Sequence, residues 1–101
     1  MKEVYSTTMT NTGGREGESV APDHSLDLKI ARPGTDVPGA TNPEQLFAAG
    51  FSACFNSALS LVMLKERLRA PSTVTATVTL YEQAEQDFII GVALGGHIEG
   101  V

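Results

Sequence analysis

Cys54 is the single cysteine in the sequence, and it lies in the apolar segment A-A-G-F-S-A-C-F-N-S-A-L. A cysteine thiolate is a strong nucleophile, so this residue could attack an electrophilic substrate. Free cysteines are also among the most buried and least reactive residues, and the apolar surroundings favour that inert interpretation. The choice between a nucleophile and a core residue therefore depends on the other residues that surround Cys54.

If the segment is helical, residues three and four positions from Cys54 lie beside it on the same face. Gly50 and Ala58 would then leave an open notch next to the sulfur. Three aromatic side chains would form the walls of this notch: Phe47, Phe51 and Phe55. A glycine inside a helix costs about 1 kcal/mol relative to alanine, so Gly50 needs a steric reason. Either an open substrate site or close packing of another helix over Gly50 would supply that reason.

Two charged residues could assist a cysteine nucleophile. Arg15 lies between glycines in G-G-R-E-G, where an arginine is usually a solvated turn residue but can also reach over an active site from a flexible loop. Glu44 is expected in the first turn of the helix, where the helix dipole alone would explain a carboxylate. A guanidinium in contact with a thiol favours its ionised form, and a carboxylate can orient that guanidinium.

The elements that would position these residues can be located from hydrophobic periodicity and turn residues. Strands are predicted at residues 4–10 and 24–31, and again at 72–81 and 88–97, because β-branched residues or a period of two dominate there. One long helix is predicted between them, from residue 43 to about residue 68. The order β-β-α-β-β indicates an α+β fold of antiparallel strands packed on a central helix, in a single domain over residues 1–101.

The helix start has a clear signature. Asn42 is a favourable N-cap, Pro43 suits the first helical position, and Gln45 occupies the capping-box position. The helix should end before Pro71. It is apolar on nearly all sides, and a chain of 101 residues has little other surface with which to cover it. We therefore expect a partner subunit to cover part of this helix.

Composition limits the possible partners and compartments. The net charge is −5 and no basic cluster is present, so a nucleic-acid partner is not expected. The N-terminus lacks the apolar region of a signal peptide, and no uninterrupted run of 18 apolar residues predicts a membrane span. A single cysteine fits a reducing compartment, and we expect the cytoplasm. His24 and His97 lie outside any ligand spacing, so no metal site is predicted.

The segment T-N-P-E-Q-L-F-A-A-G-F-S-A-C-F strongly resembles the signature helix of the OsmC/Ohr family, in the form found in its organic hydroperoxide resistance branch. G-G-R-E-G resembles the arginine loop of that branch. The resemblance implies an OsmC-like fold, an intertwined homodimer, and a cysteine peroxidase that needs no bound cofactor. It assigns the peroxidatic cysteine to Cys54, the thiolate-contacting arginine to Arg15, and the orienting carboxylate to Glu44. The substrate-binding notch would consist of Phe47, Gly50, Phe51 and Phe55.

The implied substrate is an organic hydroperoxide, and the implied reductant is dihydrolipoamide or a lipoylated protein. Members of this branch carry a second, resolving cysteine in a C-P-Y-S-like motif, which this sequence does not contain. We therefore expect a C-terminally incomplete chain, with slow turnover that depends on an external thiol. The alternative is a non-catalytic member of the same fold that binds a small apolar ligand or senses redox state.

Helix geometry restricts how the predicted site can form. Glu44 and Cys54 are ten residues apart, which places them about 15 Å apart along a straight helix and about 80° out of phase. Either the helix breaks near Gly50, or Glu44 and Arg15 reach the Cys54 of the other subunit. We favour the second arrangement, because it also covers the apolar helix.

Overall fold

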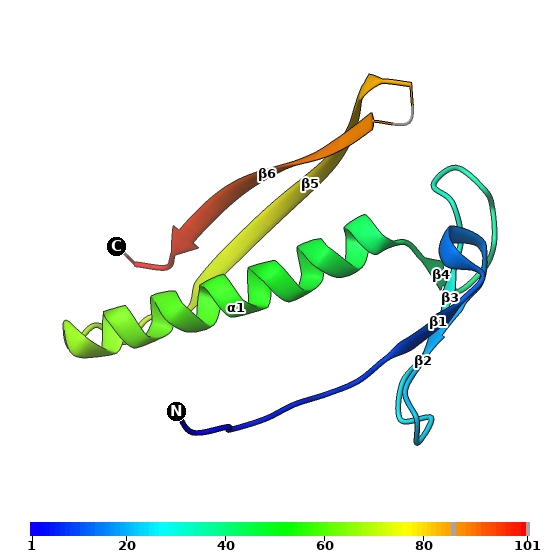
Figure 1. Ribbon diagram of the computed structural model, residues 1–101. Coiled ribbons are helices and arrows are strands. Elements are labelled where there is room, and N and C mark those ends of the chain that lie inside the picture. Colours follow the sequence, from blue (N-terminus) through cyan, green and yellow to red (C-terminus); the bar gives the residue numbers. More distant parts are fainter. Residues whose placement is uncertain (86, 101) are drawn as a thin grey trace. The chain divides into compact units, whose positions relative to one another are not determined.

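The computed structural model describes residues 1–85 and 87–100. The chain divides into two compact units, Met1–Pro43 and Glu44–Val101. Among the described residues, the first unit contains a small four-stranded sheet, and the second contains one long helix and a two-stranded sheet (Figure 1). The predicted α+β class is confirmed. The single domain and the homodimer stay predictions.

The first unit is a sheet of short strands in the order β1-β2-β3-β4. These strands are β1 (Thr10–Thr12), β2 (Glu18–Val20), β3 (Asp27–Ile30) and β4 (Ala40–Thr41). The first three pair antiparallel, and β4 runs parallel to β3. A 3₁₀ turn, η1 (Gly14–Glu16), connects β1 to β2. The fold thus has two more short strands before the helix than the predicted pair.

The predicted strand at residues 4–10 is wrong except for its last residue. In the described chain, residues 1–9 belong to no strand, and Val4 and Tyr5 are exposed. The β-branched and aromatic composition of this segment favours an extended conformation, but a strand also requires a hydrogen-bonded neighbour. This chain supplies that neighbour only from Thr10 onward, where β2 pairs with β1.

The predicted strand at 24–31 is shorter in the structure. Leu28 is half-buried and Ile30 is buried, which agrees with the predicted period of two. Leu26, which a period of two places on the same face as Leu28 and Ile30, is exposed because it lies in a tight turn before the strand. In that turn the Ala21 N–H donates to the Leu26 carbonyl over 2.9 Å, and His24 has a positive φ of 58°.

The helix α1 (Pro43–Lys65) starts at the predicted proline, and all of it beyond Pro43 belongs to the second unit. It ends before the predicted position near residue 68, because Arg67 adopts a left-handed conformation with φ of 58°. The N–H of Leu68 donates to the carbonyl of Met63 over 2.8 Å, and the N–H of Arg67 donates to the carbonyl of Leu64 over 3.0 Å. These two bonds form a Schellman motif, which satisfies the last helical carbonyls.

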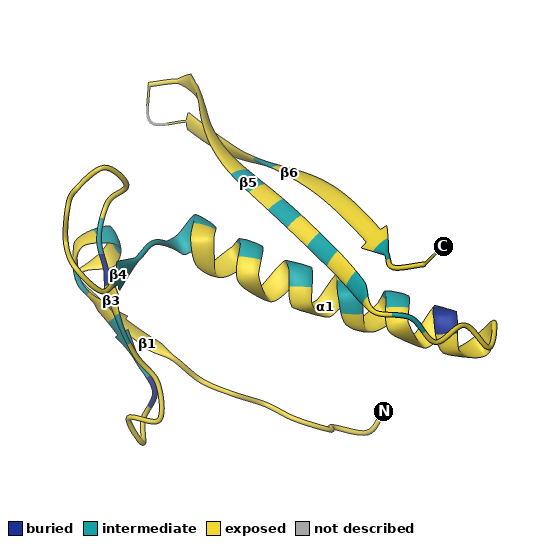
Figure 2. Cartoon of the chain, turned by 180° about the vertical axis from the view of Figure 1, so that it is seen from behind, coloured by how far each residue is buried: buried dark blue, intermediate teal, exposed yellow. Residues whose placement is uncertain are grey.

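The two predicted C-terminal strands form a long hairpin of β5 (Ser72–Ala84) and β6 (Asp87–Ile98). Their antiparallel pairing places Ser72 opposite Ile98 and continues to the tip, with a register shift between Glu82 and Ala84. The two strands therefore extend further toward each other than predicted, and Gln86 lies outside the described residues. The inward face of β5 is half-buried in alternation with exposed threonines (Figure 2). Its half-buried residues are Ser72, Val74, Ala76 and Val78, whereas Leu80, which continues the same alternation, is 39% exposed.

One face of α1 packs toward the hairpin. Five of its residues, spaced three or four apart, are half-buried or buried: Ala48, Ser52, Asn56, Leu59 and Met63. The Asn56 side-chain amide donates to the Ser72 carbonyl over 3.0 Å, and the Ser72 hydroxyl donates to Asn56 Oδ1 over 2.6 Å. These two bonds place the middle of α1 at the start of β5 and orient the helix about its axis.

Candidate functional site

Cys54 is exposed, on the side of α1 away from the hairpin. It lies two residues from both Ser52 and Asn56, which belong to the packed face, and two residues correspond to about 200° of helical rotation. The hydrogen bonds of Asn56 to the hairpin therefore turn the Cys54 sulfur to the opposite side of the helix. The interpretation of Cys54 as a core residue of its own chain is wrong, since its thiol is accessible.

The surface around Cys54 is apolar and aromatic. Phe47 and Phe51 stack, with ring centroids 5.7 Å apart and an angle of 19° between the ring planes. Phe51 and Phe47, three and seven residues before Cys54, share its side of the helix. Phe55 lies at the edge of this surface, and all three rings are more than a third exposed.

Gly50 leaves an open space beside the cysteine. A Cβ atom built at Gly50 would meet no other atom within 4 Å in the described chain. Gly50 is one turn before Cys54, so the open space is adjacent to the sulfur. No contact within the described part of the chain therefore requires a glycine at this position.

Glu44 lies in the first turn of α1 and is half-buried. The helix continues without a break from Pro43 through Gly50 to Lys65. Glu44 and Cys54 of one chain are consequently about 15 Å apart along the helix axis, beyond the reach of a glutamate side chain. Of the two arrangements considered from the sequence, a break near Gly50 is therefore wrong.

Arg15 lies in the middle of η1 in the first unit, and it is half-buried. Of the two roles considered for this arginine, a turn residue or a residue of a flexible loop, the structure shows a hydrogen-bonded turn between β1 and β2. Gly13 and Gly14 have φ of 87° and 63°, which side chains rarely adopt. At Gly17, a Cβ atom would lie only 1.8 Å from the carbonyl oxygen of Thr12, so the turn closes only with glycine there.

Three residues that sequence reasoning missed organise the Arg15 turn. Asn11 accepts a hydrogen bond from the Gly14 N–H at Oδ1 over 2.9 Å, and its amide nitrogen donates to the Gly14 carbonyl over 3.2 Å. On the other side of Arg15, Arg32 Nε donates to Glu16 Oε1. An asparagine shortly before two glycines is a recognisable turn signal, whereas the pairing of Glu16 with Arg32 needed the sheet.

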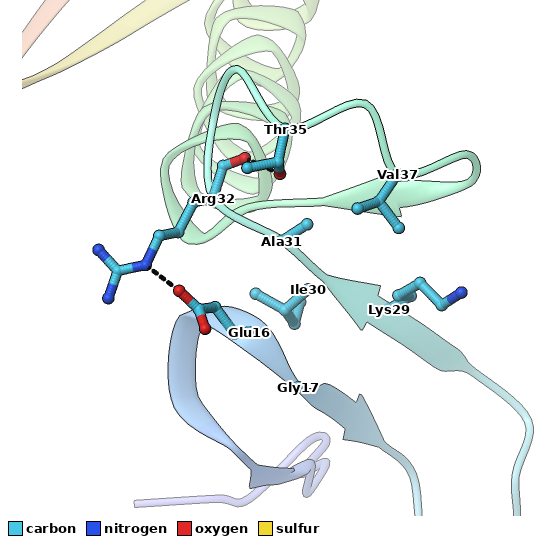
Figure 3. Close-up of a pocket in the computed structure, with 8 residues that line it drawn as sticks. All are labelled: Glu16, Gly17, Lys29, Ile30, Ala31, Arg32, Thr35 and Val37. Atoms are coloured by element: carbon cyan, nitrogen blue, oxygen red, sulfur yellow. Dashed lines mark hydrogen bonds and ion pairs between the residues drawn. The ribbon is translucent and has the colours of Figure 1, made fainter.

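An open pocket of about 460 Å³ lies next to this turn in the first unit (Figure 3). The ion pair of Glu16 and Arg32 forms part of its wall, and Ile30 supplies apolar surface. Its lining residues are Glu16, Gly17, Lys29, Ile30, Ala31, Arg32, Thr35 and Val37. The pocket contains none of the residues predicted to take part in catalysis or substrate binding.

Two further observations concern the whole described chain. Its His, Cys, Asp and Glu side chains form no group of three that could hold a metal ion. By length and composition alone, α1 could cross a membrane, with a mean hydropathy of 1.6, but core helices of soluble proteins meet the same criterion. The hydrogen bonds of Asn56 and the packed face around it indicate a helix that packs against protein on at least one side.

Comparisons with known proteins agree with the motifs in the sequence. A model of the OsmC-like protein family matches residues 34–99. The organic hydroperoxide resistance protein OhrA of Bacillus subtilis is 46% identical over 103 residues, which cover 97% of this chain and 73% of OhrA. An organic hydroperoxide resistance protein-like relative from Staphylococcus aureus is 43% identical over 84 residues, and the match covers 82% of this chain and 60% of that relative.

Solved structures show the same similarity in three dimensions. An organic hydroperoxide resistance protein from Legionella pneumophila has a TM-score of 0.86 and 42% identity, and the match covers 99% of this chain and 75% of that one. The organic hydroperoxide resistance protein OhrB of Bacillus subtilis has a TM-score of 0.84 and 35% identity, with 96% of this chain and 74% of that one covered. The chain thus spans roughly three quarters of each solved relative.

Proposed function

We propose that this chain, which belongs to the OsmC/Ohr family, reduces organic hydroperoxides to alcohols with Cys54 as the nucleophile. The observation that carries the proposal is the exposed Cys54 thiol on an aromatic face of α1, with open space beside it at Gly50. The names of the relatives support a role in hydroperoxide resistance. An apolar surface around the sulfur favours alkyl or aryl hydroperoxides over hydrogen peroxide, because burial of apolar area contributes about 25 cal/mol per Å².

In the proposed reaction, the Cys54 thiolate attacks the distal oxygen of the hydroperoxide. A sulfur–oxygen bond forms while the oxygen–oxygen bond breaks, and the leaving alkoxide takes a proton to become the alcohol. Cys54 is then a sulfenic acid, which condenses with a thiol to give a disulfide and water. We propose that this thiol is the first of the two thiols of a lipoyl-type dithiol, so that the product is a mixed disulfide with Cys54. The second thiol of the dithiol then attacks this mixed disulfide, which regenerates the Cys54 thiol and leaves the dithiol as a cyclic disulfide.

Arg15 and Glu44 are proposed to assist Cys54 from a second copy of the chain. A guanidinium in contact with the sulfur favours the thiolate, and it stabilises the negative charge that develops on the leaving alkoxide. A carboxylate bonded to the guanidinium holds its orientation. The support for a second copy is the unbroken α1, which keeps Glu44 away from the Cys54 of its own chain.

The large exposed apolar surface of the second unit supports a homodimer. Among its exposed side chains are Phe47, Phe51, Phe55, Leu61, Val62, Phe88, Ile90 and Val92. Large exposed apolar areas on soluble proteins commonly mark sites of association with another protein. Mixing Cys54→Ser subunits with Arg15→Ala subunits should restore activity if each site uses both chains. No recovery in the mixed sample, with heterodimers demonstrated by mass spectrometry, would contradict a shared site.

The decisive experiment is a steady-state peroxidase assay with cumene hydroperoxide and dihydrolipoamide, comparing the wild type with Cys54→Ser. We expect the serine variant to lose activity, and retained activity would remove the mechanism. The pH dependence of Cys54 alkylation by iodoacetamide separates catalysis from the alternative of a non-catalytic ligand-binding or redox-sensing protein. Catalysis predicts that the wild type reacts at lower pH than Arg15→Ala, and identical profiles would favour the alternative.

We propose that the protein acts in the cytoplasm.

A further inference from the structure

The residue before Arg15 is held by a single side chain. Asn11 binds both polar backbone atoms of Gly14, with its Oδ1 accepting from the Gly14 N–H over 2.9 Å and its Nδ2 donating to the Gly14 carbonyl over 3.2 Å. The same Nδ2 lies 3.0 Å from the Glu18 carbonyl and 3.2 Å from the Ser19 hydroxyl, across the hairpin on β2. Asn11 thus anchors the turn to the neighbouring strand.

These bonds determine the direction in which Arg15 leaves the turn. Gly14 has φ of 63°, a left-handed conformation that the two bonds to Asn11 stabilise. The Gly14 carbonyl belongs to the planar peptide that joins Gly14 to Arg15. Fixing this carbonyl therefore fixes the plane that contains the N and Cα atoms of Arg15, from which its side chain leaves. On the other side, the Glu16 N–H donates to the Gly13 carbonyl over 3.2 Å. Arg15 is therefore placed between two restrained neighbours.

We propose that Asn11 is a positioning residue for Arg15, acting through the backbone of Gly14. The inference rests on the proposed function, in which the Arg15 guanidinium contacts the Cys54 thiolate. An arginine side chain is long, so a small rotation of its peptide moves the guanidinium by a large distance. Misplacement of a charged group by about 1 Å can cost about 100-fold in rate. Asn11 thereby reduces the conformational entropy that Arg15 loses when it becomes ordered on substrate binding.

A purely structural role of Asn11 would have a different signature. Its bonds to Glu18 and Ser19 connect β1 with β2, so their loss would weaken the hairpin whatever residue occupies position 15. A positioning role instead requires that the effect on catalysis disappear when Arg15 is absent. A double-mutant cycle separates these two roles, because coupled residues show non-additive effects.

The experiment compares the wild type, Asn11→Ala, Arg15→Ala and the double variant. Two quantities are measured for each: kcat/KM for cumene hydroperoxide with dihydrolipoamide, and the pH profile of Cys54 alkylation by iodoacetamide. We expect Asn11→Ala to lower kcat/KM by about 10-fold to 100-fold and to shift the alkylation profile toward that of Arg15→Ala. In the Arg15→Ala background, adding Asn11→Ala should change kcat/KM by less than about two-fold.

Two further variants keep the test decisive. Thr10→Ala, a neighbouring change in β1 on the opposite sheet face, should retain wild-type activity and alkylation. If Asn11→Ala does not fold, Asn11→Asp keeps the shape and the acceptor for the Gly14 N–H but removes the amide donor, and it should show the same loss. An equal loss in both backgrounds, or an equal loss in Thr10→Ala, would overturn the positioning role. If Arg15→Ala leaves both kcat/KM and the alkylation profile unchanged, that result alone contradicts the proposed function, whatever the Asn11 variants show.

Discussion

Gly50 offers a direct test of whether the surface beside Cys54 is open to substrate. A Cβ atom at this position meets nothing within 4 Å in the described chain, so Gly50→Ala adds a methyl group without a clash. Glycine inside a helix is about 1 kcal/mol less favourable than alanine. Since no contact opposes this gain, we expect Gly50→Ala to raise the free energy of unfolding by about 1 kcal/mol. For a chain of this size, that corresponds to an increase in Tm of about 4–8 °C.

A larger side chain at the same position should block the reaction. Gly50→Leu keeps good helix propensity, and its side chain would fill the space one turn from Cys54. We expect kcat/KM for cumene hydroperoxide to fall by about 10-fold to 100-fold, because the leucine would occupy the space beside the sulfur that a bulky apolar substrate needs. The smaller substrate hydrogen peroxide should lose less. The ratio of kcat/KM for cumene hydroperoxide to kcat/KM for hydrogen peroxide therefore reports on steric access to Cys54 rather than on folding.

The assay combines thermal unfolding followed by circular dichroism with steady-state kinetics on the same preparations. Ala53→Gly, on the same helix, serves as a matched control and should lower the free energy of unfolding by about 1 kcal/mol. A lower Tm in Gly50→Ala, together with weaker self-association, would mean that another chain packs tightly over Gly50. That result would refute the interpretation of this surface as a substrate site.

Two other predictions concern hydrogen bonds in each unit. Asn56→Ala removes both bonds to the hairpin, so it should lower the free energy of unfolding, measured by urea denaturation, by about 1–3 kcal/mol. The exposed control Ser57→Ala should change this free energy by less than about 0.5 kcal/mol. Equal effects of the two substitutions would contradict the anchoring role of Asn56. The pKa of Asp23 is held below its ordinary value because the Ser25 hydroxyl and backbone N–H donate to its carboxylate. The stability that Asp23 contributes is therefore present above the ordinary aspartate pKa of about 3.9, and it is lost as the pH falls through the lower pKa of the folded state. Ser25→Ala should raise the pKa of Asp23 in an NMR titration. An unchanged titration curve would contradict the role of the Ser25 hydroxyl.

Local patterns in the sequence determined the helix and the long hairpin. Pro43 marked the start of α1 correctly, because proline suits the first helical turn and has no N–H to leave unsatisfied. The alternation around Val74 and Val78 located β5, because its inward side chains pack against one face of α1. Spacing along a helix also sufficed to group Phe51 with Cys54, since this relation depends only on the 3.6-residue period.

Contacts between distant residues decided what the sequence could not. Whether Cys54 was buried or exposed depended on which side of α1 faced the hairpin, and the bonds between Asn56 and Ser72 set that side. The glycines around Arg15 indicate a turn in the sequence, whereas the bonds from Asn11 that hold this turn form only when β1 pairs with β2. Periodicity reports local conformation, but accessibility and orientation arise from the groups that meet after the chain has folded.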